Sequence, residues 1–215
     1  MNSHQLTSFK AVPLGSAKNA WGQVISALQD TIAVHIQVHD EKGRLEVEEW
    51  LGKGSFIRDA GYKDGQLAHI SLRGIKTVDY DVKNNLTREY STSQTAPTRD
   101  LISNLRAAFN DMKDSADLTM VERRAGNYSQ VEISGSVQIH SLNILGTEYS
   151  PGEQILLRLL IEPGSGRLHS LEQHRLDATG LEQESSFASF QWELEAPPEL
   201  RKISYPPGTR VERSQ

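Results

Sequence analysis

The hydrophobic period of the chain changes near residue 30, from the period of a helix to that of a strand. The helical stretch is expected over residues 17–29, because its apolar side chains recur at i, i+3, i+4 and i+7, at Trp21, Val24, Ile25 and Leu28. Strict alternation follows at once, at Ile32, Val34, Ile36 and Val38. Alternation of this kind gives a strand with one apolar face. The chain is therefore predicted to combine helices with half-buried strands.

Turn residues divide the following stretch into about six short strands in meander order, from residue 31 to residue 91. A polar linker and a second amphipathic helix over residues 98–114 come next. Further strands are expected over residues 119–123, 130–133, 137–144, 154–161, 167–176 and 185–195. The tail holds four prolines and is expected to be extended and to lie over the sheet.

Composition excludes several classes of protein. Twenty-three Lys and Arg against 28 Asp and Glu give a net charge of -5, which argues against nucleic acid as a partner. No apolar run reaches the roughly 18 residues of a membrane-spanning helix. The absence of Cys excludes disulfides and thiol chemistry. No phosphate-binding glycine motif is present, so neither a nucleotide nor another cofactor is expected.

The residues that could carry catalysis or bind metal form weak patterns. His35 and His39 are four apart on a strand, about 13 Å, too far for shared ligation, so we expect no metal and place the histidines on a solvated face. Glu46 and Glu48 would share one strand face at a separation that suits a glycosidase-like hydrolase. A charged outer face explains the same pattern more simply. We therefore assign no catalytic residue and keep a carboxylate hydrolase as an alternative.

Aromatic residues are spread over the first predicted sheet. Packing of that sheet against the helices is their expected role, but a partly covered apolar face could also hold a long apolar ligand. The candidate ligand contacts are Trp50, Phe56, Ile70, Tyr80 and Tyr90.

The order of helix, meander, helix, strands and Pro-rich end resembles the LolA/LolB superfamily, which includes lipoprotein carriers and the sigma-factor regulator RseB. The resemblance covers roughly residues 17–211. Its motifs are WGQVISAL at residues 21–28, VHIQV at 34–38, EWL at 49–51 with FIR at 56–58, VDYD at 78–81 and YPPG at 205–208.

The resemblance implies an α+β fold with an open, curved antiparallel β half-barrel and helices packed on its concave face. It divides the chain into a flexible segment over residues 1–16 and a single domain over residues 17–215. It also implies a non-enzymatic binding or sensing domain outside the cytoplasm. Its partner would be a lipid, an acyl chain or a protein, with sigma-factor regulation as one role. A structural or self-assembly module is a further alternative.

The N-terminal residues 1–12 are polar and lack the pattern of a signal peptide. We therefore expect either a cytoplasmic protein or an exported one whose leader or anchor is absent from this chain.

Overall fold

The computed structural model describes residues 14–30, 33–52, 56–73, 76–91, 100–113, 118–137 and 142–213. Two helices are present in this part, α1 (Leu14–Gln29) and α2 (Leu101–Lys113). The first group of strands is β1 (Val34–Asp40), β2 (Leu45–Gly52), β3 (Phe56–Lys63), β4 (Gln66–Arg73), β5 (Lys76–Asp81) and β6 (Leu86–Ser91). The second is β7 (Leu118–Ala125), β8 (Tyr128–Ser136), β9 (Leu142–Ile144), β10 (Thr147–Tyr149), β11 (Gln154–Ile161), β12 (Leu168–Leu176), β13 (Glu182–Trp192) and β14 (Arg210–Arg213).

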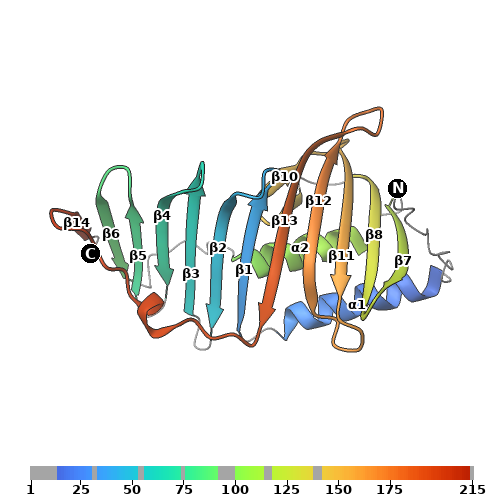
Figure 1. The fold of residues 1–215 in the computed structure, drawn as a ribbon, viewed down its shortest axis with the longest axis horizontal. Helices are drawn as coiled ribbons and strands as arrows, with labels where there is room; N and C mark the ends of the chain where they lie inside the picture. Colours follow the sequence, from blue (N-terminus) through green and yellow to red (C-terminus); the bar gives the residue numbers. More distant parts are fainter. Residues whose placement is uncertain are drawn as a thin grey trace, which may run out of the picture.

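Twelve of these strands form one open sheet, in the order β14-β6-β5-β4-β3-β2-β1-β13-β12-β11-β8-β7. The first six follow each other as an antiparallel meander, and β13 joins them to the second half of the chain by pairing with β1. Among the strands that the structure describes, β14 alone pairs in parallel, with β6. The sheet is long and curved, and both helices lie on one side of it (Figure 1). This confirms the expected α+β fold with an open half-barrel.

The helices cover the part of the sheet that runs from β7 to β2. Here the core is filled by side chains that are almost completely buried, including Trp21 of α1 and Phe109 of α2, whose ring centroids are 4.3 Å apart. Ile36, Ile133 and Leu157 of the sheet face them and are fully buried. The apolar faces of both helices thus pack into one continuous core.

Alternation along each strand defines two faces of the sheet. Val34, Ile36 and Val38 of β1 belong to the helix-side core, and we call this side the helix face. His35 and His39 point to the opposite side, which we call the back face. The cross-strand register carries this assignment from β1 through to β6.

Some expected elements differ from the observed ones. Helix α1 begins at Leu14, so residues 14–16 of the segment expected to be flexible are helical, and residues 1–13 lie outside the described residues. The strand expected over residues 137–144 is not continuous in the sheet: β8 ends at Ser136, residues 138–141 lie outside the described residues, and β9 pairs with β10 as a separate hairpin. The tail contains a 3-10 turn, Pro198–Arg201, and the edge strand β14.

Candidate ligand-binding site

Four of the five predicted ligand contacts lie on the back face, and the register brings them onto neighbouring strands. Trp50 of β2 stands opposite Arg58 of β3, two residues from Phe56 on the same face. Ile70 of β4 pairs with Tyr80 of β5. Together with Ala60, Leu72 and Val78 they form a largely apolar surface, which we call the aromatic face; the buried Arg58 lies on it between Trp50 and Leu72.

Tyr90 does not belong to this group. It stands opposite Thr77, one residue out of phase with Val78 and Tyr80, and so lies on the helix face of β6. The structure therefore brings together Trp50, Phe56, Ile70 and Tyr80 and separates Tyr90 from them.

Trp50 stacks on a buried polar cluster at one end of the aromatic face. Its ring lies 3.7 Å from the ring of His35, with 13° between the planes. His35 is only 7% exposed, and its two ring nitrogens contact Glu48 Oε1 at 2.9 Å and Gln191 Oε1 at 3.2 Å. The hydrogen bond from His35 lowers the pKa of Glu48, and Arg58 at 3.5 Å adds to the effect. The expectation of a solvated His35 is thus wrong, because the Trp50 ring covers it.

The segment after β13 lies against the other end of the aromatic face. The Arg201 guanidinium is 6.0 Å from the centre of the Phe56 ring, and the Tyr205 ring is 5.8 Å from that of Tyr80. The Tyr80 and Thr209 hydroxyls both donate to Asn85 Oδ1, at 3.1 and 2.7 Å. Figure 1 shows this red segment running along the lower ends of the strands before it turns up beside β6 as β14.

The two glutamates considered for hydrolysis lie in different surroundings. Register slips between β1 and β2, so that Val38 pairs with Val47, His39 pairs with Leu45, and Glu46 between them has no partner. Such a bulge redirects side chains that simple alternation would place together. Glu48 is engaged by His35 on the back face, whereas Glu46 lines a pocket with residues of β10 and β12. The structure does not bring the two carboxylates together as a pair.

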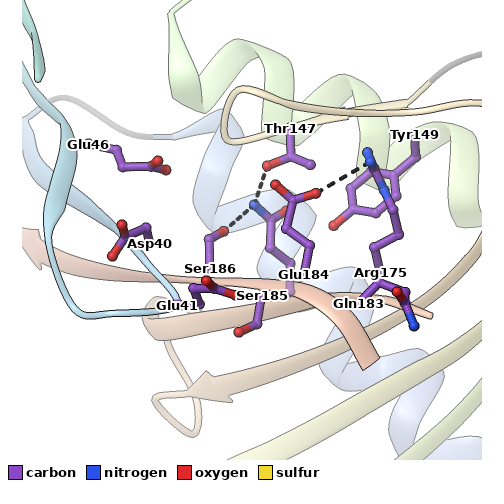
Figure 2. A pocket seen from close by; sticks show the side chains of 11 residues that line it. Asp40, Glu41, Glu46, Thr147, Tyr149, Arg175, Gln183, Glu184, Ser185 and Ser186 are labelled. Carbon is purple, nitrogen blue, oxygen red and sulfur yellow. Dashed lines mark hydrogen bonds and ion pairs between the residues drawn. The ribbon is translucent and has the colours of Figure 1, made fainter. Parts of the chain in front are cut away.

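That pocket has a volume of about 470 Å³ and lies where the β9–β10 hairpin meets β12, β13 and the β1–β2 turn. Its wall carries four carboxylates, Asp40, Glu41, Glu46 and Glu184, and one guanidinium, Arg175. We call it the acidic pocket. Figure 2 shows Asp40 and Glu46 on one side of it and Glu184, Thr147 and Tyr149 on the other. Composition and periodicity did not single out this site, because its walls come from four separate parts of the chain.

A second hollow, of about 410 Å³, adjoins the acidic pocket and shares Asp40 and Glu41 with it. It is lined by His39, His174 and Phe187. His174 Nδ1 lies 3.0 Å from Glu182 Oε1, and this contact is the largest cause of the lowered pKa of Glu182.

Within the described ranges, no group of three or more His, Asp or Glu side chains is placed to hold a metal ion. Neither α1 nor α2, as far as the structure describes them, is long and apolar enough to cross a membrane.

Comparison with known proteins finds similarity only among solved structures. No family model matches the chain, and no curated protein matches it. The crystal structure of the Mycobacterium tuberculosis lipoprotein LppX is similar with 12% identity and a TM-score of 0.48, covering 86% of this chain and 99% of that one. LprF from Mycobacterium bovis gives 12% identity and a TM-score of 0.48, covering 93% and 100%. The hypothetical lipoprotein YmcC from Escherichia coli gives 11% identity and a TM-score of 0.22, covering 86% and 93%.

Proposed function

We propose that this chain is a non-enzymatic binding domain that takes up an acyl chain, of a lipid or a lipoprotein, on the aromatic face. The observation that carries the proposal is the apolar surface formed by Trp50, Phe56, Ile70 and Tyr80 on the side away from the helices. Trp50 and Tyr80 are each only 6% exposed. In this structure the irregular C-terminal segment of the same chain covers part of the surface.

The C-terminal segment is held by contacts that a ligand could replace. Two ion pairs tie β14 to β6, Arg88–Glu212 at 3.3 Å and Arg213–Glu89 at 3.2 Å, and three of these four side chains are about half exposed or more. Exposed ion pairs contribute only about 0–1 kcal/mol each. The segment is also held by the backbone pairing of β14 with β6, by the ring contacts of Arg201 and Tyr205, and by the hydrogen bond from Thr209 to Asn85.

An acyl chain could compensate for the apolar surface uncovered when the segment moves. Exposing three large side chains such as Tyr80 costs about 2 kcal/mol each, or about 6 kcal/mol in total. Burial of each methylene contributes about 0.8 kcal/mol. A stretch of about eight methylenes would therefore offset the cost, which is within the length of an ordinary lipid tail.

The resemblance over residues 17–211 supports a place outside the cytoplasm and a carrier or sensing role. By the same resemblance, the occupied or empty state of the aromatic face would be passed to a partner protein, as in the control of a sigma factor. We propose a single domain over residues 17–215, which α1 extends to Leu14 at its N-terminal end.

A hydrolytic role has less support from the site. Glu48 is held ionised by His35 and Arg58, which removes it as a general acid. Glu46 lies in another pocket. Glu46 and Glu48 therefore do not face each other across one cleft, as the two carboxylates of a glycosidase must.

A fluorescent fatty acid tests the proposal directly in titrations of the full chain. We expect Ile70→Asp to weaken binding by at least tenfold, because it places a charge on the aromatic face. Leu181→Asp, at a side chain that is 65% exposed, is the matched control and should leave binding unchanged. Tyr205→Ala should tighten binding several-fold, since it removes a ring contact that holds the competing segment.

Equal binding by the Ile70→Asp and Leu181→Asp variants would place the ligand elsewhere. A wild-type chain that binds no fatty acid would refute the acyl-binding function.

A further inference from the structure

We propose that the acyl ligand of the aromatic face carries an anionic head, a carboxylate or a phosphate, and that Arg58 binds this head. The inference rests on the proposed function and names the class of ligand that the face would accept. Two observations carry it: a positive charge is buried on a largely apolar surface, and this charge lies between a polar and an apolar part of the same face.

Arg58 is a cation in apolar surroundings. Trp50 of β2 and Leu72 of β4 stand directly opposite it on the two neighbouring strands. Phe56 and Ala60, two residues away along β3 in either direction, lie on the same face. The Arg58 side chain is only 10% exposed. Arginine is seldom buried to this degree without a partner, since burial removes the hydration of its charge.

The partner that Arg58 has within the chain leaves its guanidinium incompletely bound. Glu48 Oε2 lies 3.5 Å from Arg58 Nη1, which makes an ion pair. Nη1 is nevertheless buried and makes no hydrogen bond with any residue that the structure describes. A guanidinium has five N–H donors on a planar fork, and its strongest partners are carboxylates and phosphates that accept two of them at once. An anionic head would supply the acceptors that Glu48 does not.

Glu48 leaves room on the guanidinium for a second anion. Its Oε1 lies 2.9 Å from His35 Nε2, and this hydrogen bond is the largest cause of the lowered pKa of Glu48. The charge of Glu48 is therefore stabilised by His35 as well as by Arg58. Because the guanidinium is a planar fork, a second anion can bind at an edge that does not face Glu48.

The position of Arg58 sets the direction of the ligand. On one side of it lies the polar cluster of His35 and Glu48. On the other side, Leu72 of β4 and Val78 of β5 continue the same row across the sheet. Neighbouring strands lie about 4.8 Å apart, so the row from Arg58 to Val78 extends about 10 Å. A head at Arg58 thus places the acyl tail along the apolar side chains of β4 and β5.

The movement that opens the aromatic face also reaches the surroundings of Arg58. The C-terminal segment contacts the face through Arg201, whose guanidinium is 6.0 Å from the centre of the Phe56 ring. Phe56 precedes Arg58 by two residues on the same face of β3. When the segment leaves, this part of the face would become accessible to the head of the ligand.

A neutral head would fit this place less well. An ester or hydroxyl group would cover the guanidinium without neutralising it, and the charge would stay buried with the ion pair to Glu48 alone. Hydrogen bonds between two charged groups are about twice as strong as those between neutral groups. The affinity should therefore depend strongly on the charge of the head when the tail is kept the same.

Titrations of the full chain with three probes that share one palmitoyl tail test the inference. The probes are palmitate, palmitoyl lysophosphatidic acid and the neutral monopalmitoyl glycerol, each used below the concentration at which it forms micelles. We expect the two anionic probes to bind at least tenfold more tightly than the neutral one. Tighter binding of palmitate would identify a free fatty acid as the ligand, and tighter binding of the lysophosphatidic acid a phospholipid head. Equal binding of all three would overturn the inference and leave acyl binding standing, whereas binding of none would refute acyl binding itself.

Two variants test the role of Arg58 itself. Arg58→Met keeps an unbranched side chain and removes the charge, so it should weaken the binding of palmitate at least tenfold and leave that of monopalmitoyl glycerol unchanged. Arg124→Met, the same change at an exposed position of β7, is the matched control and should bind every probe as the wild type does. Unchanged palmitate binding by Arg58→Met would overturn the inference, as would equal weakening by Arg124→Met. The comparison of probes on the wild-type chain decides the question even if Arg58→Met does not fold.

Discussion

Glu49→Gln should remove most of the pH dependence of stability between about pH 4.5 and pH 8. Glu49 lies on the helix face of β2, is 2% exposed, and accepts hydrogen bonds from the Leu101 amide at the start of α2, at 3.0 and 3.1 Å. Burial raises the pKa of Glu49 from 4.5 to about 8, against the opposing effect of the Leu101 amide. The carboxyl group is therefore neutral in the folded chain at pH 7.

The magnitude follows from linkage between protonation and folding. The pKa is higher in the folded than in the unfolded chain, so its contribution to stability is complete below pH 4.5 and is lost as the pH rises to about 8. Each pH unit in this window removes about 1.4 kcal/mol, which sums to about 5 kcal/mol. Total stabilities of about 5–15 kcal/mol make such a loss easy to detect.

Urea unfolding at several pH values, followed by circular dichroism, measures this effect. Glutamine cannot ionise but keeps an oxygen that can accept from Leu101, so the variant should hold its stability up to pH 8. Its advantage over the wild type should therefore grow by about 5 kcal/mol across the window. Glu199→Gln serves as the control and should follow the wild type. Parallel pH profiles for the Glu49→Gln variant and the wild type would refute the argument.

Two substitutions test the packing of α1. Trp21→Ala should lower the free energy of unfolding by about 3–5 kcal/mol, because Trp21 is 2% exposed and packs on Phe109. The control Leu181→Ala, at an exposed position, should change the free energy of unfolding by less than about 0.5 kcal/mol. Gly166→Ala should destabilise by about 1–3 kcal/mol, since Gly166 has a φ of +72° and a Cβ would lie 2.3 Å from the carbonyl oxygen of Gln23. Thermal melts check both, and unchanged melts would show that α1 does not pack as described.

Long apolar patterns predicted the fold well. The run over residues 154–161 matches β11 at both ends, because a strongly apolar stretch of that length has few alternatives to a buried strand. Long apolar patterns also predict the helix with Trp21 at its centre and the strands of the meander. The hairpin β9–β10 was missed, since strands of three residues are too short for a period to show. β14 has four exposed residues and no apolar face to detect.

The site was less predictable than the fold. Alternation alone places Glu46 and Glu48 on one face, but a one-residue bulge separates them, and a bulge leaves no mark in the hydrophobic pattern. The relative faces of Tyr80 and Tyr90 depend on how β5 pairs with β6. The burial of Gln173 beside β10 follows from the fold, and no pattern in the sequence indicates it.

Native mass spectrometry with lipid extraction measures directly whether the chain binds an acyl group. The measurement uses the full chain purified from cells without detergent. We expect a bound species of lipid mass that is lost on extraction and reduced in the Ile70→Asp variant. A single apo mass, unchanged after incubation with fatty acids, would contradict it.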